Sequence, residues 1–494
     1  MKADLGKNES VRRADASVTL MGLMFAFALM AFGVTFTWFV KDSGLFLIQL
    51  PLVLVTFAVL VVTGLLYFIN PTRWLAFFLI GLVYFSFEVT LRGGGGGADL
   101  QSVLKGVFTL ALAALGILTA LRSSFQTPLL ALFFAYSVIA LASAFYSPLM
   151  VIGLVAGIGL VGVSVISAKM ATGTLADVTG YWRAIYWASV TTAVLSLTVL
   201  IIAPNQARDV LDPVNYRLRG VTGAANTLGP IMGIAIMVGL FMIQQARTKW
   251  AWRFHAAMLM LFSAELLLTN SRSSILGTVA GVALSLIVSG GVGIMGMLVG
   301  GFALTVLMTV MLYPGLQEAL LSTLAAAFSR TGQVSELTTF TGRQQIWEAS
   351  WQLIHDAPWF GYGLSSVAVK ISQTFSDQWG NTVSTAHNSL LESLISVGVV
   401  GTMPLILVVL MSIWYLVRYL MSSTDVLIAE DQTDLQMKRG LARCALGCIV
   451  MMLVQGFGEK SFAGHPGSPF LALGGVVATA VFISLHPLRK RQFI

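Results

Sequence analysis

The sequence has few charged residues for its length. Of its 494 residues, 10% are charged and 57% are hydrophobic, whereas a typical soluble domain carries about 25% charged residues. The mean hydropathy of +0.85 therefore excludes a soluble globule. Repeated apolar runs of about 20 residues instead predict an all-α, polytopic membrane protein.

Cysteine is also scarce, and the common motifs of soluble enzymes are missing. Cys444 and Cys448 stand one helical turn apart inside an apolar run, a spacing that favours packing over a redox pair or a metal site. The sequence has no Walker-type phosphate loop, zinc motif, nucleotide fingerprint or internal repeat. We therefore expect no metal ion and no cofactor, and we expect any chemistry to lie at the outer face of the membrane.

The excess of positive charge does not predict a nucleic-acid partner. The net charge is +8, but the basic residues stand in the gaps between apolar runs and form no continuous stripe. Basic residues before the first run, in the even-numbered gaps and in the C-terminal tail place both termini in the cytoplasm. No cleavage signal follows the first run, so that span is expected to be retained.

Runs of apolar residues predict about fourteen transmembrane helices. The run from Asn388 to Arg418 is too long for a simple crossing. The predicted runs begin near Val18, Leu45, Trp74, Leu104, Pro128, Pro148, Ala184, Asn226, Phe254, Ser274, Val292, Ser389, Leu441 and Pro466.

The polar gaps divide the chain into two parts. Residues 1–203 are expected to form N-terminal transmembrane helices, and residues 204–494 a transmembrane half that carries the chemistry. Two of the gaps on the outer side are long, at 204–225 and 314–386. We predict that both are periplasmic loops and that the longer one carries short helices.

Three arginines stand at predicted outer edges of the membrane, namely Arg219, Arg272 and Arg343. Glycines beside Arg219 and Arg343 let the backbone approach a ligand closely, and a guanidinium fork matches phosphate oxygens. If the three arginines cluster, they would form a diphosphate site. The alternative is that each extends to lipid headgroups, although arginines on the outer side run against the usual inward bias of positive charge.

A histidine begins the long run that follows. His387 is adjacent to Asn388, and Glu392 lies little more than one helical turn further on. Histidine titrates near neutral pH and can take a proton from a sugar hydroxyl. The alternative is a histidine that is only hydrogen-bonded at the membrane interface.

An ordered set of motifs resembles a known family. The set covers roughly Arg217 to Ala480 and resembles the O-antigen ligase and O-antigen/exopolysaccharide polymerase superfamily, most closely its exopolysaccharide-polymerase branch. It comprises Arg219-Gly220 with Gly223, Asn226 and Gly229, then Ser271-Arg272-Ser273, Gly342-Arg343 with Ile346-Trp347, Pro358 with Gly361-Tyr362-Gly363, and His387-Asn388 with Leu391-Glu392.

The resemblance implies a glycosyltransferase C-type membrane architecture and a polysaccharide polymerase at the periplasmic face of the bacterial inner membrane. Such an enzyme transfers glycan from an undecaprenyl-diphosphate-linked donor to a hydroxyl of a lipid-linked acceptor, with inversion and without a metal. By the same resemblance, Arg219 and Arg343 would hold the diphosphate, and His387 would orient or deprotonate the acceptor hydroxyl. The residues implied in substrate binding are Arg217, Arg272, Asn226, Asn388 and Glu392; whether Arg217 or Arg219 reaches the phosphate stays open.

Two alternatives to the polymerase are considered. An O-antigen ligase would use the same donor but transfer the glycan to lipid A–core oligosaccharide. A transporter of lipid-linked sugars would show paired halves and charges near the bilayer centre, whereas the notable polar groups here gather at the outer face of one half. Membrane lipids and other polysaccharide export proteins are the further expected partners.

Overall fold

The computed structural model is all-helical in the part of the chain that it describes. That part comprises short helical pieces at 80–81, 83–84 and 108–114, followed by 127–209, 216–288, 343–374, 384–422, 432–463 and 467–486. The helices are α5 (Pro128–Ser143), a 3-10 turn η1 (Ala144–Tyr146), α6 (Met150–Ala171), α7 (Leu175–Ile202), α8 (Ala225–Gln244), α9 (Lys249–Leu268), α10 (Arg272–Ile287), α14 (Arg343–Asp356), α15 (Val367–Thr374), α16 (Ser389–Met421), α17 (Gln432–Gly456) and α18 (Ser468–Leu485).

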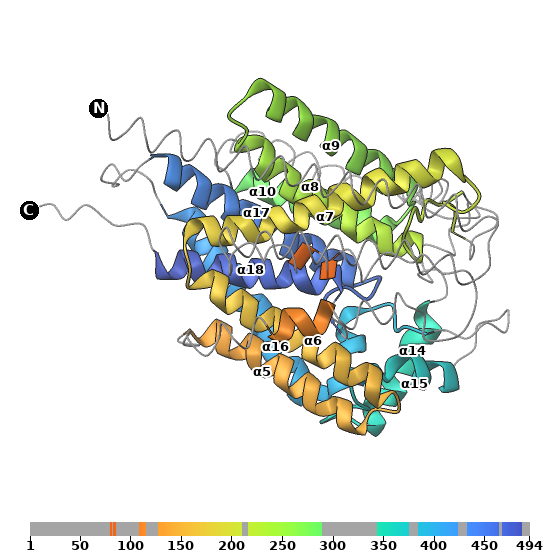
Figure 1. Cartoon of the computed structure of the whole chain (residues 1–494). Helices are drawn as coiled ribbons and strands as arrows, with labels where there is room; N and C mark the ends of the chain where they lie inside the picture. Colours follow the sequence, from red (N-terminus) through yellow and green to blue (C-terminus); the bar gives the residue numbers. More distant parts are fainter. Residues whose placement is uncertain are drawn as a thin grey trace, which may run out of the picture.

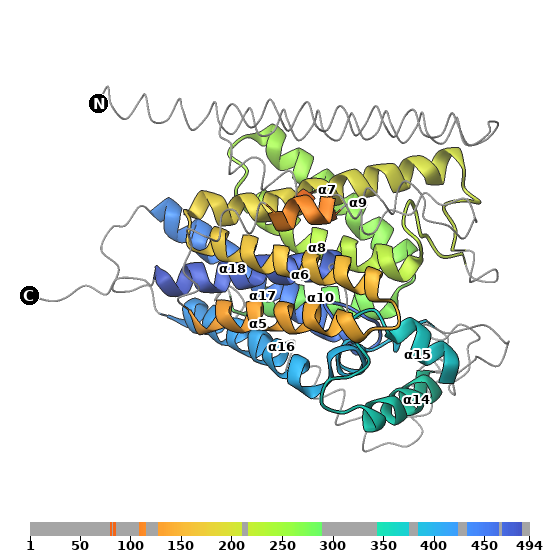
Figure 2. The ribbon, with the colours of Figure 1, turned by 60° about the horizontal axis from the view of Figure 1, so that its bottom comes forward.

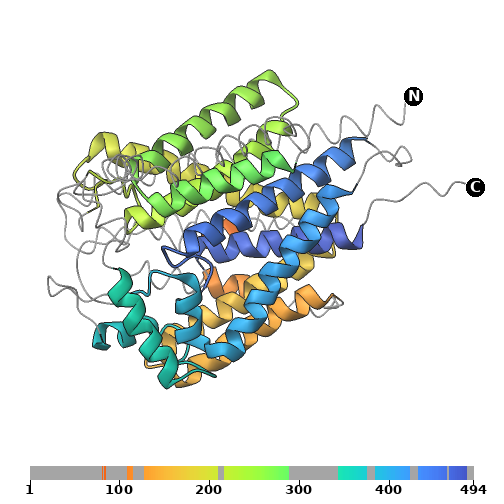
Figure 3. The ribbon, with the colours of Figure 1, turned by 180° about the vertical axis from the view of Figure 1, so that it is seen from behind.

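The long helices run side by side in one bundle, and α14 and α15 lie beyond one end of it (Figures 1 and 2). Figure 3, from behind, places the same two short helices at that same end. Among the described helices, seven are long and apolar enough to cross a membrane: α5 with η1, α6, α7, α8, α9, α16 and α18. The short helices predicted for the gap 314–386 are therefore present, while the side of the membrane on which they lie stays a prediction.

Nine of the predicted apolar runs coincide with described helices, from α5 to α10 and from α16 to α18. Two of these helices begin well before their apolar runs: α7 begins at Leu175, before the run near Ala184, and α17 begins at Gln432, before the run near Leu441. In α7 the reason is a polar first turn. There the Asp177 carboxylate accepts the Thr174 backbone N–H at 2.7 Å in a capping box, so the helix begins in a polar turn before its apolar run. The runs near Val18, Leu45 and Val292 lie outside the described residues, as do most of those near Trp74 and Leu104, and the total of fourteen spans stays a prediction.

The bundle is organised around α18, the most enclosed of the seven candidate spans, with 89% of its apolar window buried. On α7, the Tyr181 hydroxyl donates to the Leu471 carbonyl at 2.8 Å, and the Trp182 indole N–H donates to the Thr479 hydroxyl at 3.0 Å. Both rings are fully buried. Buried aromatic residues with satisfied polar atoms fix the register of α7 against α18.

Small residues bring α10 and α17 close together. A Cβ on Gly277 would lie 2.6 Å from the Met451 carbonyl oxygen, and one on Gly281 would lie 2.5 Å from that of Gly447. Glycines four residues apart let the backbones of membrane helices approach in this way. The packing places the first residues of α10 beside the end of α17, where the polar cluster described below lies.

The long helix α16, whose apolar run is too long for a simple crossing, is broken. Gly398 interrupts it with φ of 63°, and the loop 358–363 fills the break. The Val399 and Val400 backbone N–H groups donate to the carbonyls of Pro358 and Trp359 at 2.9 and 3.1 Å. The carbonyls of α16 that the break frees accept from the Tyr362 and Gly363 N–H groups, each at 2.8 Å.

Two glycines in left-handed conformation make this junction possible. Gly361 has φ of 63°, and a Cβ there would lie 2.5 Å from the Ile395 carbonyl oxygen; a Cβ on Gly398 would clash with the Trp359 carbonyl. Other residues cannot adopt this backbone without strain, and no space is left for a side chain. The junction fixes the end of α14 against α16. Arg343 is the first residue of α14, and His387 lies in the loop just before α16.

Candidate functional site

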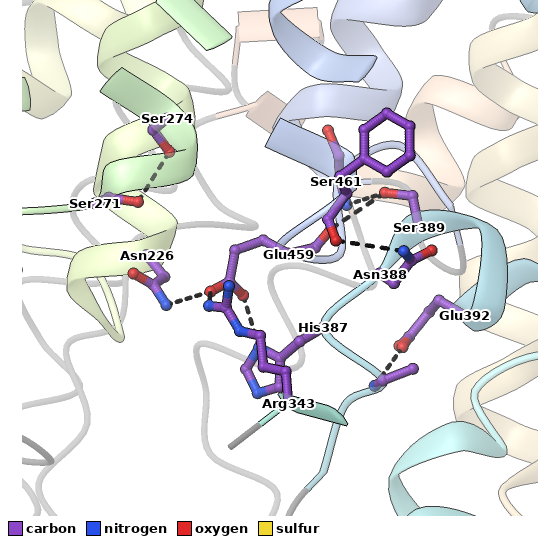
Figure 4. Close-up of polar contacts among 12 residues, drawn as sticks. Asn226, Ser271, Ser274, Arg343, His387, Asn388, Ser389, Glu392, Glu459 and Ser461 are labelled. Carbon is purple, nitrogen blue, oxygen red and sulfur yellow. Dashed lines mark hydrogen bonds and ion pairs between the residues drawn. The ribbon is translucent and has the colours of Figure 1, made fainter. Parts of the chain in front are cut away.

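The site is built around a buried carboxylate, Glu459. It follows α17 in a tight turn, in which the Gly458 and Glu459 N–H groups donate to the Gln455 carbonyl at 3.1 and 3.0 Å. Only 7% of its side chain is exposed. Figure 4 shows three side chains from separate elements directed at this carboxylate, those of Asn226, Arg343 and His387.

Arg343, the first residue of α14, forms an ion pair with this carboxylate. Its Nη2 lies 2.5 Å from Glu459 Oε1. A Cβ on Gly458 would lie 3.0 Å from Arg343 Nη1 and 3.4 Å from the Ser273 Cβ. Because Gly458 has no side chain, the Arg343 guanidinium has space to lie beside the first turn of α10.

His387 contacts the other oxygen of the carboxylate, with Nδ1 2.8 Å from Glu459 Oε2. His387 has a positive φ of 47°, which is uncommon for a residue with a side chain and is found where surrounding contacts hold it. Two such contacts are present. Buried Glu392 accepts the Ala386 N–H at 2.9 Å, and the Asn388 side chain caps α16 by accepting the Leu390 N–H at 2.9 Å.

Asn226, in the first turn of α8, connects Glu459 to a buried arginine. Its Nδ2 donates to Glu459 Oε1 at 2.6 Å, and its Oδ1 accepts from Arg217 Nη2 at 2.5 Å. Arg217 Nε donates to the Thr269 carbonyl at 3.0 Å. These bonds fix the Arg217 guanidinium between the end of α9 and the start of α8.

The electrostatics of the cluster favour an anion. Burial tends to raise the pKa of Glu459, but the hydrogen bond and charge of His387, with the charges of Arg343 and Arg217, hold this pKa below its usual range. Glu459 is therefore ionised at neutral pH and can only accept hydrogen bonds. Because α8, α14 and α16 all begin at the cluster, their positive dipole ends add to the two arginines.

The ionised carboxylate also determines the tautomer of His387. Since Glu459 Oε2 can only accept, the proton of that hydrogen bond is on Nδ1 of the imidazole. The other ring nitrogen, Nε2, is then an acceptor when the histidine is neutral. The histidine side chain is 30% exposed, so this part of the site is open to an incoming group.

Not all the predicted site residues join the cluster. The Arg219 guanidinium donates from Nε to the Gln206 carbonyl at 3.0 Å and forms no bond to Glu459. Arg272 begins α10 near the cluster, next to Ser273. Asn388 and Glu392 hold the loop of His387 by the backbone contacts given above. Of the two arginines that sequence left open, Arg217 is the one connected to Asn226.

Sequence reasoning missed Glu459. The signal available was an acidic residue directly after an apolar run, in a short gap that also holds Lys460. Such a residue is usually a solvated residue at a helix end, and only its burial against Arg343 and His387 distinguishes it. In the part of the chain that the structure describes, no group of three or more His, Cys, Asp or Glu residues is placed to hold a metal ion.

One segment of the chain is similar to a known protein family. Residues 257–406 match the O-antigen ligase family, and this range includes both Arg343 and His387. The match confirms the predicted resemblance to the O-antigen ligase and polymerase superfamily. No curated protein matches the chain.

Proposed function

We propose that the chain is a membrane glycosyltransferase that moves a glycan from undecaprenyl diphosphate to the hydroxyl of a lipid-linked repeat unit. The observation that carries the proposal is the shared carboxylate, because Glu459 joins Arg343 to His387. A phosphate-binding group and a proton acceptor are the two functions that this transfer requires. The match of residues 257–406 to the O-antigen ligase family supports the same class of reaction.

The donor half of the proposed site is formed by Arg343 and Arg217. Both carry permanently charged guanidinium groups with several N–H donors, which suit the oxygens of a diphosphate. As the sugar–oxygen bond breaks, the leaving diphosphate gains negative charge, and fixed cations in a water-poor site stabilise that charge. Arg219, half-buried on the same segment, and Arg272 are proposed to contact the outer part of the donor.

The acceptor half is formed by His387. Its Nε2 takes the proton of the acceptor hydroxyl while the hydroxyl oxygen bonds to the anomeric carbon of the donor sugar. The bond from that carbon to the diphosphate oxygen breaks in the same displacement, and the electron pair leaves with the diphosphate. Attack from the face opposite the leaving group inverts the anomeric centre. Glu459 holds the imidazole orientation and stabilises its positive charge.

An O-antigen ligase is the second candidate, favoured by the description of the matching family. It would use the same donor half and differ in the acceptor, lipid A–core oligosaccharide. Gene deletion distinguishes the two: loss of a polymerase leaves single repeats on the carrier lipid, whereas loss of a ligase leaves long chains that are not attached to a final acceptor.

The direct test is transfer by the purified protein with a lipid-diphosphate oligosaccharide, with and without a metal chelator. The proposal expects elongated products on the acceptor lipid in both cases and none with His387→Ala. Absence of any transfer with matched donor and acceptor, or full activity of His387→Ala, would overturn it.

A further inference from the structure

A second cluster of positive charge lies on α17, far from Glu459, which follows the end of that helix. Arg439 and Arg443 are one turn apart on α17, which ends at Gly456. Arg443 precedes Gly456 by 13 residues (456 − 443), or about 20 Å along a helix that rises 1.5 Å per residue. Since α17 packs against α8, α10 and α18 in the bundle, this arginine lies toward the opposite end of the bundle from the proposed site.

Neither arginine has a carboxylate partner among the described residues. The Nε atoms of Arg439 and Arg443 are both buried and without a hydrogen-bond partner. Arg439 Nη2 donates to the Ser422 carbonyl at the end of α16, at 2.9 Å. The charged neighbour of Arg443 is Arg439 itself, which has the same sign.

This arrangement is costly without a counter-ion. A guanidinium keeps its charge in proteins, and a buried donor left without a partner is destabilising, more so when it is charged. Two like charges one turn apart on a helix repel each other. Charged residues inside membrane helices that persist under such a cost mark binding sites for ions or ligands.

We propose that Arg439 and Arg443 bind the phosphate of an anionic phospholipid in the cytoplasmic leaflet. Two guanidinium groups one turn apart, about 6 Å between Cβ atoms, can both contact one phosphate. The inward bias of positive charge assigns this end of α17 to the cytoplasm, where anionic headgroups attract clusters of Lys and Arg. Both residues are half-buried, so the pair is not fully enclosed in the bundle.

The surrounding charges support a lipid phosphate. Lys438 is adjacent to the pair, and Arg418 is in the last turn of α16, whose end contacts Arg439. The described acid on this part of α17 is Asp434, in the first turn and exposed. The site is separate from the Glu459 cluster and does not depend on the proposed transfer reaction.

The test uses the purified full-length protein after removal of lipid. Retained lipid is measured by native mass spectrometry. Thermal unfolding is measured in three conditions: detergent micelles with phosphatidylglycerol, detergent micelles with phosphatidylcholine, and detergent micelles with inorganic phosphate. We expect the wild-type protein to retain and be stabilised by phosphatidylglycerol in preference to phosphatidylcholine. From the attraction typical of two arginines, R439Q/R443Q should bind phosphatidylglycerol about 30-fold more weakly.

The matched control is Arg253→Gln, which removes an exposed positive charge from the first turns of α9 and should keep the response to phosphatidylglycerol. Equal retention of phosphatidylglycerol by R439Q/R443Q and wild type would overturn the proposal. So would stabilisation by inorganic phosphate equal to that by the lipid, which would assign the site to a free anion. If the double variant does not fold, equal retention of the two lipids by the wild-type protein overturns the proposal on its own.

Discussion

His387 Nδ1 lies 2.8 Å from Glu459 Oε2, so a buried, ionised carboxylate orients the imidazole and leaves Nε2 as its accepting nitrogen. The same carboxylate binds Arg343 through Oε1. The donor and acceptor halves of the proposed site therefore share one residue. A substitution at Glu459 should affect both halves, whereas substitutions of its partners should each affect one.

Removal of the imidazole tests the acceptor half. His387→Ala should slow transfer by about 10²–10⁴-fold, the usual contribution of a general base, while donor affinity stays near that of wild type. The measurement is the initial rate at saturating donor together with direct donor binding. Loss of donor binding instead of transfer would mean that His387 is a binding residue.

Glu459→Gln keeps the size of the side chain but removes its charge. We expect transfer to fall by about 10²-fold or more, because the imidazole loses the acceptor that fixes its tautomer. Glu348→Gln is the matched control, since Glu348 is an exposed acid on α14 whose carboxylate accepts from Gln344. A rate for Glu459→Gln equal to that of the control would contradict the orienting role.

Substitutions of Arg217, Arg343 and Arg219 are predicted to reduce kcat/KM by different amounts. Arg217→Ala and Arg343→Ala should each reduce kcat/KM by about 10²–10³-fold, the scale of losing one fixed donor to a developing anion. Lysine should restore little, because it lacks the planar fork. Arg219→Ala should cost less than Arg217→Ala, since the Arg219 Nε is bonded to the Gln206 carbonyl and not to the cluster. The reverse order in measured kcat/KM would assign the phosphate contact to Arg219.

The lowered pKa of Glu459 predicts how stability depends on pH. In an unfolded chain the pKa of a glutamate is about 4.3, and in the folded protein the pKa of Glu459 lies below its usual value. The stability from its ionised form is therefore fully present above the unfolded value and is lost as pH falls through the folded one. The unfolding temperature of wild type minus that of Glu459→Gln should be constant above about pH 5 and decrease below about pH 4. A difference that grows on acidification would show that folding raises the pKa of Glu459 instead of lowering it.

The junction at the break in α16 predicts a stability effect. Gly398→Ala and Gly361→Ala should each destabilise the protein by about 1–3 kcal/mol, because the positive φ and the lack of space act together. Gly81→Ala is the control, since a Cβ there meets an oxygen at 3.6 Å, an ordinary contact. Thermal unfolding in one detergent compares the three. Equal unfolding temperatures would mean that the junction tolerates a side chain.

Part of this arrangement was readable in the sequence. Arg343 stood out because an arginine at an outer membrane edge runs against the inward bias of positive charge, and His387 because a histidine can take a proton near neutral pH. The run at Ser389 stood out as too long for a simple crossing, and the structure breaks it at Gly398. Glu459 did not stand out, because its importance lies in contacts with α14 and with the loop before α16, and these are remote in sequence. The burial that distinguishes it exists only after the bundle packs.

The two arginines near Gly220 illustrate the same limit. Arg217 and Arg219 stand two residues apart and share their sequence surroundings. The fold separates them, because the Thr269 carbonyl and the Asn226 side chain bind Arg217, whereas Arg219 lies against the preceding loop. The local sequence around Arg217 and Arg219 does not show this difference, because it depends on contacts with residues remote in the chain.

The loop 358–363 joins α16 through main-chain atoms, and this has a consequence for how such a protein can diversify. Except at Gly361 and Gly363, which both have positive φ, its main-chain hydrogen bonds do not depend on side-chain identity. Trp359 and Phe360 are 64% and 62% exposed and so can change while the backbone keeps its course. Relatives can thus alter this surface without moving Arg343 at the start of α14 or His387 in the loop before α16.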